Sequence, residues 1–393
     1  MPSSTPVILA ARRTPIGRFL GGLSRVPSPE LGAKAIAAAL VDAETDPASI
    51  DEVFMGCVLQ AGVGQNPARQ AALKAGLPDT ITAVTINKVC GSGLEAVMQA
   101  CRAIKSGDIA CAVAGGMENM DLAPHFAHVR AGVKYGSATM EDHMAFDGLR
   151  CAFENWPMGN AAEWIATEHD ISRDEQDRFS AQSHNRAEAA WSGGFFDNEI
   201  ISMSADECHA RQGVEKDEGF REGSTAEALG KLRPAFQKDG SVTAGNASQI
   251  SDGAAAVVVA SEEFAASTSA TPIARILAYN TRGIEPKKLF WAPKLSIEAL
   301  LKDNNLTVED IDLFEINEAF SAQVLANAKG LGVPEEKLNI AGGGIALGHP
   351  IGASGARVLA TLIHQLHRTG GSKGICSLCL GGGNAVSMLI ERC

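Results

Sequence analysis

Two glycine-rich stretches decide the fold: Asn87-Lys88-Val89-Cys90-Gly91-Ser92-Gly93 in the first half of the chain, and Gly348-His349-Pro350-Ile351-Gly352-Ala353-Ser354-Gly355 in the second. Each stretch is followed by apolar residues at helical spacing, and then by a short apolar run that is typical of a strand and ends near glycines. Cys90 and His349 lie 259 positions apart. We interpret the chain as two similar α/β halves, packed so that the two stretches face each other.

Further landmarks repeat in the same order. Glu52-Val53-Phe54 is matched by Asp312-Leu313-Phe314, an offset of 260 positions. The two helices are expected to end at Ser106-Gly107 and Gly370-Gly371, and the strands after them are expected at 109–114 and 374–380. The alternative is that the similarity between the two halves arises by chance, because units of glycine, helix, strand and glycine are common.

The region between the halves, 121–249, has a different character. It holds most of the Trp and His residues and many charges, and we interpret it as an inserted loop domain that carries binding surfaces. The predicted layout is an N-terminal half at 1–120, completed by about 250–270, then the loop domain, and a C-terminal half at 271–393.

Composition excludes several classes of protein. The formal net charge of −12, without a basic cluster, argues against nucleic acid as a partner. Nine cysteines among 393 residues are too few for a disulfide scaffold and indicate a reducing compartment. No apolar run approaches the roughly 20 residues that span a bilayer, and the short polar start does not look like a signal peptide. We expect a cytoplasmic protein that contacts no membrane.

Cys90 is the first candidate for chemistry. It lies where the alternating run 81–86, typical of a strand, turns into a helix. The positive end of the helix dipole favours a thiolate there, and the small residues that follow leave room for a substrate carbonyl. The alternative is a small buried side chain, which we expect of Cys101 and Cys111.

His349 and Asn317 are the next candidates. A histidine in the second glycine-rich stretch could take a proton from Cys90 and return it, although a surface or capping histidine is the alternative. Asn317 follows the expected strand 313–316, where an amide can orient a water or an oxyanion. It could instead be an ordinary helix N-cap.

Two weaker patterns suggest different chemistry. Cys376 and Cys379 form a CxxC, but residues three apart in a strand point to opposite faces, which disfavours a redox pair or half of a zinc site. Cys379 is the better placed to reach an active site, with Cys376 turned into the core. Gly91-x-Gly93-x-x-Ala96 is a weak dinucleotide fingerprint, because Asn87 and Lys88 interrupt the strand that should precede it.

The chain resembles the thiolase family over essentially its whole length, and most closely the acetyl-CoA acetyltransferases. The resemblance implies duplicated layered α/β halves, in the order α-β-α-β-α, with an inserted loop domain. The segments that carry it are the two glycine-rich stretches, Ala11-Arg12-Arg13-Thr14-Pro15-Ile16-Gly17, Gly115-Gly116-Met117-Glu118-Asn119-Met120, Gly245-Asn246-Ala247-Ser248, Asn317-Glu318-Ala319-Phe320 and Cys379-Leu380-Gly381-Gly382-Gly383.

The resemblance implies a role for each catalytic candidate. Cys90 would hold the acyl group, His349 would activate it, and Cys379 would act as acid and base on the incoming acetyl-CoA. Asn317 would hold a water in one oxyanion hole, and the N–H groups of Cys90 and Gly381 would form the other. The implied reaction is the reversible condensation of two acetyl-CoA to acetoacetyl-CoA and CoA, or thiolysis of short 3-oxoacyl-CoA, in fatty acid metabolism.

The family also implies the binding partners. Coenzyme A would be substrate and product, with no permanently bound cofactor and no metal. The segment 130–136 resembles the loop that joins dimers into tetramers, so a homotetramer is expected. The residues that fall at coenzyme A or pantetheine contacts are Leu149, Met158, Arg221, Ser248, Ala319 and Phe320.

The sequence departs from the family pattern near the acyl site. Pro157 precedes Met158-Gly159 where acetoacetyl-CoA thiolases usually have a histidine, and the bulky Phe290 and Trp291 stand where small residues are usual. These positions leave chain length and direction open, including a broad-range degradative thiolase. Less favoured are a non-catalytic acyl-CoA or lipid carrier, a decarboxylating ketoacyl synthase, which needs a histidine at position 379, and a nicotinamide enzyme.

Overall fold

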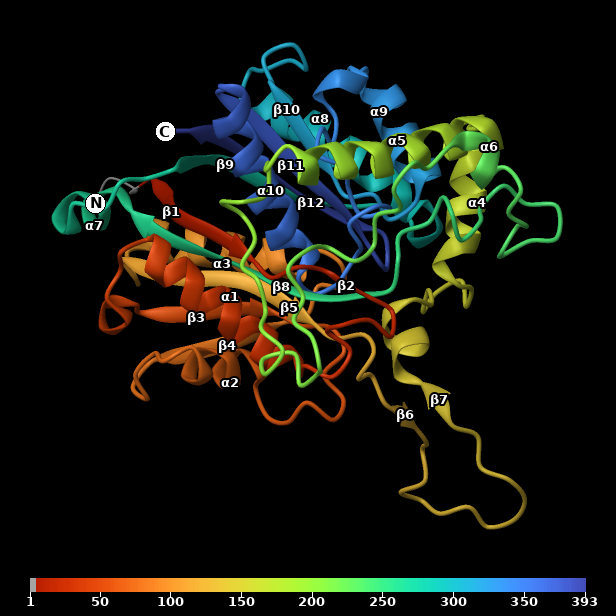
Figure 1. Ribbon diagram of the computed structural model, residues 1–393, viewed down its shortest axis with the longest axis horizontal. Helices are drawn as coiled ribbons and strands as arrows, with labels where there is room; N and C mark the ends of the chain where they lie inside the picture. The colour runs from red at the N-terminus through yellow and green to blue at the C-terminus, as the bar shows by residue number, and fades with distance from the viewer. Residues whose placement is uncertain (1–4) are drawn as a thin grey trace.

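The computed structural model describes residues 5–393 and contains helices and strands throughout (Figure 1). The strands are β1 Pro6–Arg13, β2 Gly17–Arg18, β3 Glu52–Gly56, β4 Thr82–Ile86, β5 Cys111–Glu118, β6 His125–Phe126, β7 Glu141–Asp142, β8 Ser251–Ser261, β9 Ala274–Gly283, β10 Leu313–Ile316, β11 Lys373–Leu380 and β12 Asn384–Arg392. The α-helices are α1 Ser28–Asp42, α2 Pro67–Lys74, α3 Ser92–Ser106, α4 Met158–Glu168, α5 Arg173–Ser192, α6 Ala226–Leu229, α7 Glu262–Thr268, α8 Ala292–Asp303, α9 Ser321–Leu331 and α10 Ser354–Thr369.

The sheet is continuous across both halves. Its main path runs β10-β11-β12-β9-β1-β8-β5-β3-β4, and β2 pairs with β8 beside it. Only two residue pairs join β1 to β9, Val7 with Arg275 and Ile8 with Ala274. This narrow junction divides the sheet into two half-sheets, as the duplicated halves predict.

The layers follow from which apolar side chains pack together. One buried cluster joins α1 and α2 to the first half-sheet, and another joins α8 and α9 to the second. A third cluster contains α3 and α10 together with strand residues from both half-sheets. The order is therefore α-β-α-β-α, with α3 and α10 as the central layer, and the expected fold class is confirmed.

Glycines let the two central helices meet at their N-terminal ends. A Cβ on Gly93 would lie 2.8 Å from the backbone nitrogen of Ala356, and one on Gly355 would lie 2.2 Å from the nitrogen of Leu94. Gly93 is thus used for helix packing. The equivalent helices begin at Ser92 and Ser354, 262 positions apart. The counterpart of Cys90 is therefore near Gly352, and His349 lies three residues earlier.

The expected match of Glu52-Val53-Phe54 with 312–314 is also wrong, by one residue. The Asp51 carboxylate accepts the N–H groups of Ala110 and Cys111, and Asp312 accepts those of Ser372 and Lys373 in the same way. The offset at these strands is 261, one less than at the helices. A slip of one residue changes the face on which every strand side chain lies, so Phe54 corresponds to Glu315.

The strand expected at 109–114 continues through its glycines to Glu118. A Cβ on Gly116 would lie 2.0 Å from the carbonyl oxygen of Gly352. The glycines therefore extend the strand and let the loop that carries His349 approach it closely.

Part of the region 121–249 projects from the layered body. Figure 1 shows a long excursion around β6 and β7 that extends away from the sheets, and Tyr135, between these two strands in the sequence, is 99% exposed. The helices α4 and α5 pack closer to the C-terminal half (Figure 1). Within residues 5–393, no helix is both long enough and apolar enough to cross a membrane.

Candidate active site

Cys90 stands on a strained turn between β4 and α3. Val89 before it has φ of 49°, a left-handed conformation that is costly for a β-branched residue. The turn is held by the hydroxyl of Ser92, which donates to the Val89 carbonyl at 2.6 Å and accepts the Lys88 N–H at 2.8 Å. The strained turn and the two hydrogen bonds of Ser92 place the Cys90 sulfur at the start of α3, as the sequence predicts.

The expected thiolate is wrong for the protein without substrate. Burial raises the pKa of Cys90 to about 12, and the charge of Glu118 acts in the same direction. The backbone N–H groups of Cys90 and Gly381 interact with the sulfur and oppose this rise in pKa, but they do not cancel it. Cys90 therefore rests as a thiol, and its proton has to be removed by a base.

Cys379 lies on β11 close to Cys90. The two cysteines of the CxxC face opposite sides of the sheet, because Cys376 packs in the central layer and Cys379 packs with Phe320 on the other side. Burial raises the pKa of the Cys379 thiol well above its ordinary value, and the proximity of Cys90 raises it further. Two neutral thiols from different halves of the chain are thus brought together.

His349 is buried and neutral. Burial, and to a smaller extent the charge of Arg357, lowers its pKa to about 3. Its Nδ1 lies 2.6 Å from the hydroxyl of Ser354, and that hydroxyl donates its only proton to the Pro350 carbonyl at 2.8 Å. When the hydroxyl donates to Pro350 in this way, Nδ1 carries the ring proton and the lone pair of Nε2 is free to accept another.

Asn317 follows β10 and lies beside the imidazole. Its Nδ2 is 3.4 Å from both ring nitrogens of His349, and its Oδ1 accepts a hydrogen bond from Arg357 at 3.2 Å. The helix α9 starts only at Ser321, after Phe320 as its N-cap, so the N-cap alternative for Asn317 is wrong.

Glu118 is a site residue that the sequence reasoning did not single out. Its buried carboxylate accepts N–H groups from Val58, Leu59 and Gly352, at 2.9 to 3.1 Å. Burial raises its pKa to about 7. It thus ties the His349 loop to the N-terminal half. The available signal was an acidic residue directly after the apolar, glycine-containing strand.

Four of the candidate coenzyme A contacts form two pairs that are joined by backbone hydrogen bonds. The Met158 N–H donates to the Leu149 carbonyl, and the Ser248 N–H donates to that of Ala319, both at 2.9 Å. Leu149 packs in the apolar cluster beside Cys90. Met158, Ala319 and Phe320 pack in the cluster that contains Cys379.

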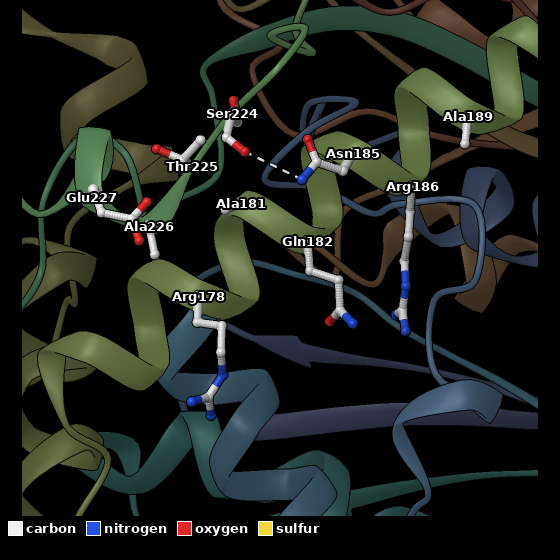
Figure 2. Close-up of a pocket in the computed structure, with 10 residues that line it drawn as sticks. All are labelled: Arg178, Ala181, Gln182, Asn185, Arg186, Ala189, Ser224, Thr225, Ala226 and Glu227. Carbon is white, nitrogen blue, oxygen red and sulfur yellow. Dashed lines mark hydrogen bonds between the residues drawn. The ribbon is translucent and has the colours of Figure 1, made fainter.

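Arg221 lies on an exposed segment, and its own backbone N–H donates to Nδ1 of His184 at 3.1 Å. Next to this segment is a cavity of about 580 Å³, open to solvent. In Figure 2, Asn185 of α5 donates to the Ser224 carbonyl at the start of the neighbouring segment, whereas Arg178, Gln182 and Arg186 line the same cavity and point away from that segment. None of its lining residues is a predicted site residue.

The comparisons with known proteins match this arrangement. Residues 6–263 match the family described as thiolase, N-terminal domain, and residues 270–392 match thiolase, C-terminal domain. The chain belongs to the thiolase family. This thiolase is 48% identical to the acetyl-CoA acetyltransferase of Cupriavidus necator, with 98% of this chain and 99% of that protein covered. It is also 48% identical to that of Escherichia coli, with 98% of each covered.

A solved structure agrees over the full length. The crystal structure of the Bacillus anthracis acetyl-CoA acetyltransferase superposes with a TM-score of 0.97, at 41% identity and with 100% of both chains covered. This thiolase is therefore an acyltransferase, and the Claisen condensation is the general reaction of its family.

Proposed function

We propose that this thiolase interconverts acetyl-CoA and acetoacetyl-CoA, and cleaves other short 3-oxoacyl-CoA thioesters, through an acyl group on Cys90. The observation that carries the proposal is the position of the Cys90 sulfur, on a strained turn and in contact with the N–H groups of Cys90 and Gly381. An oxygen on a carbon bonded to that sulfur would meet the same two donors, which is the geometry of an oxyanion hole.

In the first half of thiolysis, Nε2 of His349 takes the proton of Cys90 as its sulfur attacks the 3-oxo carbon. The new bond joins sulfur to that carbon, and the bond between carbons 2 and 3 breaks. The electron pair moves to carbon 2 of the departing acetyl-CoA, and the Cys379 thiol protonates that carbon. In the second half, coenzyme A gives its thiol proton to Cys379 and attacks the acyl group, and Cys90 recovers a proton from His349.

Asn317 and His349 would stabilise the thioester of the departing acetyl-CoA, which is the second thioester in the reaction. The carbanion next to that thioester places negative charge on its oxygen, so hydrogen-bond donors are needed there. The Asn317 amide, through a water, and the protonated imidazole face the same space beside Cys379 in this proposal. The same groups work in condensation, where Cys379 removes the α-proton.

Coenzyme A would extend from these groups along Leu149, Met158, Ser248, Ala319 and Phe320. The hydrogen-bonded pairs and shared apolar clusters of these residues support this path. Arg221 is the candidate partner for a phosphate. The region 121–249 would thus act as the coenzyme A-binding domain, between halves at 1–120 and 271–393.

Chain length would be set near Cys379. Phe290 is buried in the same cluster as Cys379 and packs on Phe320 with ring centroids 5.4 Å apart. Trp291 instead stacks on His169 at 3.9 Å. We infer that Phe290 limits the acyl group and that Trp291 fixes the neighbouring loop. A clear preference for medium chains would instead favour a broad-range degradative thiolase.

We further propose a cytoplasmic homotetramer. The excursion around β6 and β7 carries exposed apolar side chains, including Val129, Val133 and Met140, beside the fully exposed Tyr135. Such a projecting apolar surface is expected to be covered by another subunit. The low number of cysteines, none of them paired in a disulfide in residues 5–393, suits a reducing compartment.

The test is to trap the acyl enzyme. Mass spectrometry after brief incubation with acetyl-CoA should find one acetyl group on Cys90, and thiolysis of acetoacetyl-CoA should be lost in Cys90→Ala. Cys101→Ala is the matched control, since Cys101 is a buried cysteine on α3. Tight coenzyme A binding without acylation or turnover would contradict the proposal and favour the non-catalytic carrier.

A further inference from the structure

Arg357 lies in the first turn of α10, three residues after Ser354. It is buried, with its Nη2 3.2 Å from Oδ1 of Asn317 and its Nη1 3.8 Å from a carboxylate oxygen of Glu315. Ser354 holds His349 from the same helical turn. One turn of the central layer therefore contacts both of the polar side chains proposed to face the second thioester.

The chemistry of the guanidinium decides how the Asn317 amide is oriented. An arginine side chain has only N–H donors, so the oxygen of the amide must face it. The amide nitrogen then faces His349, which agrees with its 3.4 Å distance to both ring nitrogens. A partner with both a donor and an acceptor would allow either orientation.

A buried arginine is costly unless its charge is compensated. Glu315 is its ion-pair partner, and Nε and Nη1 of Arg357 have no hydrogen-bond partner among the described residues. A well-packed apolar side chain would fill this position at a lower cost in free energy, so stability alone does not explain Arg357.

We propose that Arg357 is a positioning residue, which fixes the amide of Asn317 so that its nitrogen can hold the water that donates to the thioester oxygen. The inference rests on the proposed function, because it assigns Arg357 a role through Asn317 in that reaction. Glu315 lies 3.8 Å from Nη1 of Arg357, and burial raises the pKa of this carboxyl to about 8.

The charge of Arg357 has a second, separable consequence. It lowers the pKa of His349, and the other charged groups around Arg357 are Arg13, Glu199, Glu315 and Glu318. Removing the positive charge should raise the His349 pKa. The acid limb of the pH profile of kcat should then move to higher pH, whereas a lysine should leave it in place.

The experiment compares Arg357→Met, Arg357→Gln and Arg357→Lys with the wild-type protein. We expect kcat to fall about 10-fold to 100-fold in the methionine and glutamine variants, because the amide is no longer held. The KM for coenzyme A should stay within about twofold, and lysine should restore part of kcat. If the methionine variant does not fold, the glutamine variant carries the test.

Thr361→Val is the matched control. Thr361 lies one turn further along α10 and donates to the buried Glu199, without contact to Asn317. It should change stability without moving the pH profile. A glutamine variant with wild-type kcat and an unmoved acid limb would overturn the inference and leave the proposed function intact.

A failure of the proposed function would look different. In that case the wild-type protein itself would form no acyl-Cys90. A crystal structure of the glutamine or methionine variant would still decide the inference, since it should show the Asn317 amide turned or disordered, and an unchanged amide would refute it.

Discussion

Replacing Ser354 with alanine should slow catalysis by removing the group that sets the tautomer of His349. The hydroxyl lies 2.6 Å from Nδ1 and 2.8 Å from the Pro350 carbonyl oxygen, and when it donates to that oxygen it accepts the Nδ1 proton. The Pro350 carbonyl keeps a second donor, the Ser354 backbone N–H at 2.9 Å, so the loop stays closed without the hydroxyl. The hydrogen-bond partner that is lost is therefore that of the His349 imidazole.

The size of the effect follows from burial. A buried N–H group without a partner costs about 1 to 3 kcal/mol, so the neutral ring would move its proton to Nε2, where the lone pair is needed. Since 1.36 kcal/mol corresponds to about tenfold in rate, kcat should fall roughly 5-fold to 150-fold. KM should change little, because the hydroxyl does not contact coenzyme A in the proposed path.

The assay is steady-state thiolysis of acetoacetyl-CoA, together with nitrogen NMR of the His349 ring to determine its tautomer. Ser180→Ala is the matched control, since Ser180 is a buried helical serine that donates to the carbonyl four residues earlier at 2.8 Å and contacts no histidine. If Ser354→Ala loses no more activity than this control, the tautomer argument is refuted.

Three further changes test the packing, the buried charges and the assembly. Gly355→Ala places a Cβ 2.2 Å from the backbone of α3 and should lower the free energy of unfolding in urea by about 3 kcal/mol. The control Gly107→Ala, at φ of 83° and with no neighbour within 4 Å, should lower it by about 1 kcal/mol. Equal losses in the two variants would contradict the close contact at Gly355. Burial beside Asp121 raises the pKa of Asp252 to about 8, so ionisation weakens the folded state as pH rises from about 4 to 8. Asp252→Asn should therefore raise the melting temperature at pH 8 and have little effect near pH 4, and a gain independent of pH would argue against the linkage. Tyr135→Asp should convert tetramers to dimers in light scattering without loss of fold, and an unchanged mass would exclude this loop from the interface.

Local sequence patterns were sufficient to predict these secondary-structure elements and the turn that carries Cys90. Alternation marked β4, helical spacing and terminal glycines marked α3 and α10, and strand alternation separated Cys376 from Cys379. These features depend on residues within one turn or one strand, so they can be recognised without knowing what packs against them.

Relations between distant segments were predicted less well. The repeat was recognised, but its register was wrong by one residue at Asp51, because neighbouring acidic and apolar residues match at either offset. The thiolate expected of Cys90 was wrong because a helix dipole is a local effect, whereas burial depends on the whole fold.

From the residues alone, two α/β halves, an intervening region and the residue types of a thiolase could be predicted. The pKa shifts of Cys90 and His349, and the contacts of Glu118 and Arg357, became visible only in the folded chain. The physical reason is that protonation and orientation depend on solvent exclusion and on hydrogen-bond partners. Some of those partners are close in sequence, as Ser354 is to His349, and others are remote, as Glu118 is from Gly352, and only the packed chain brings the remote ones together.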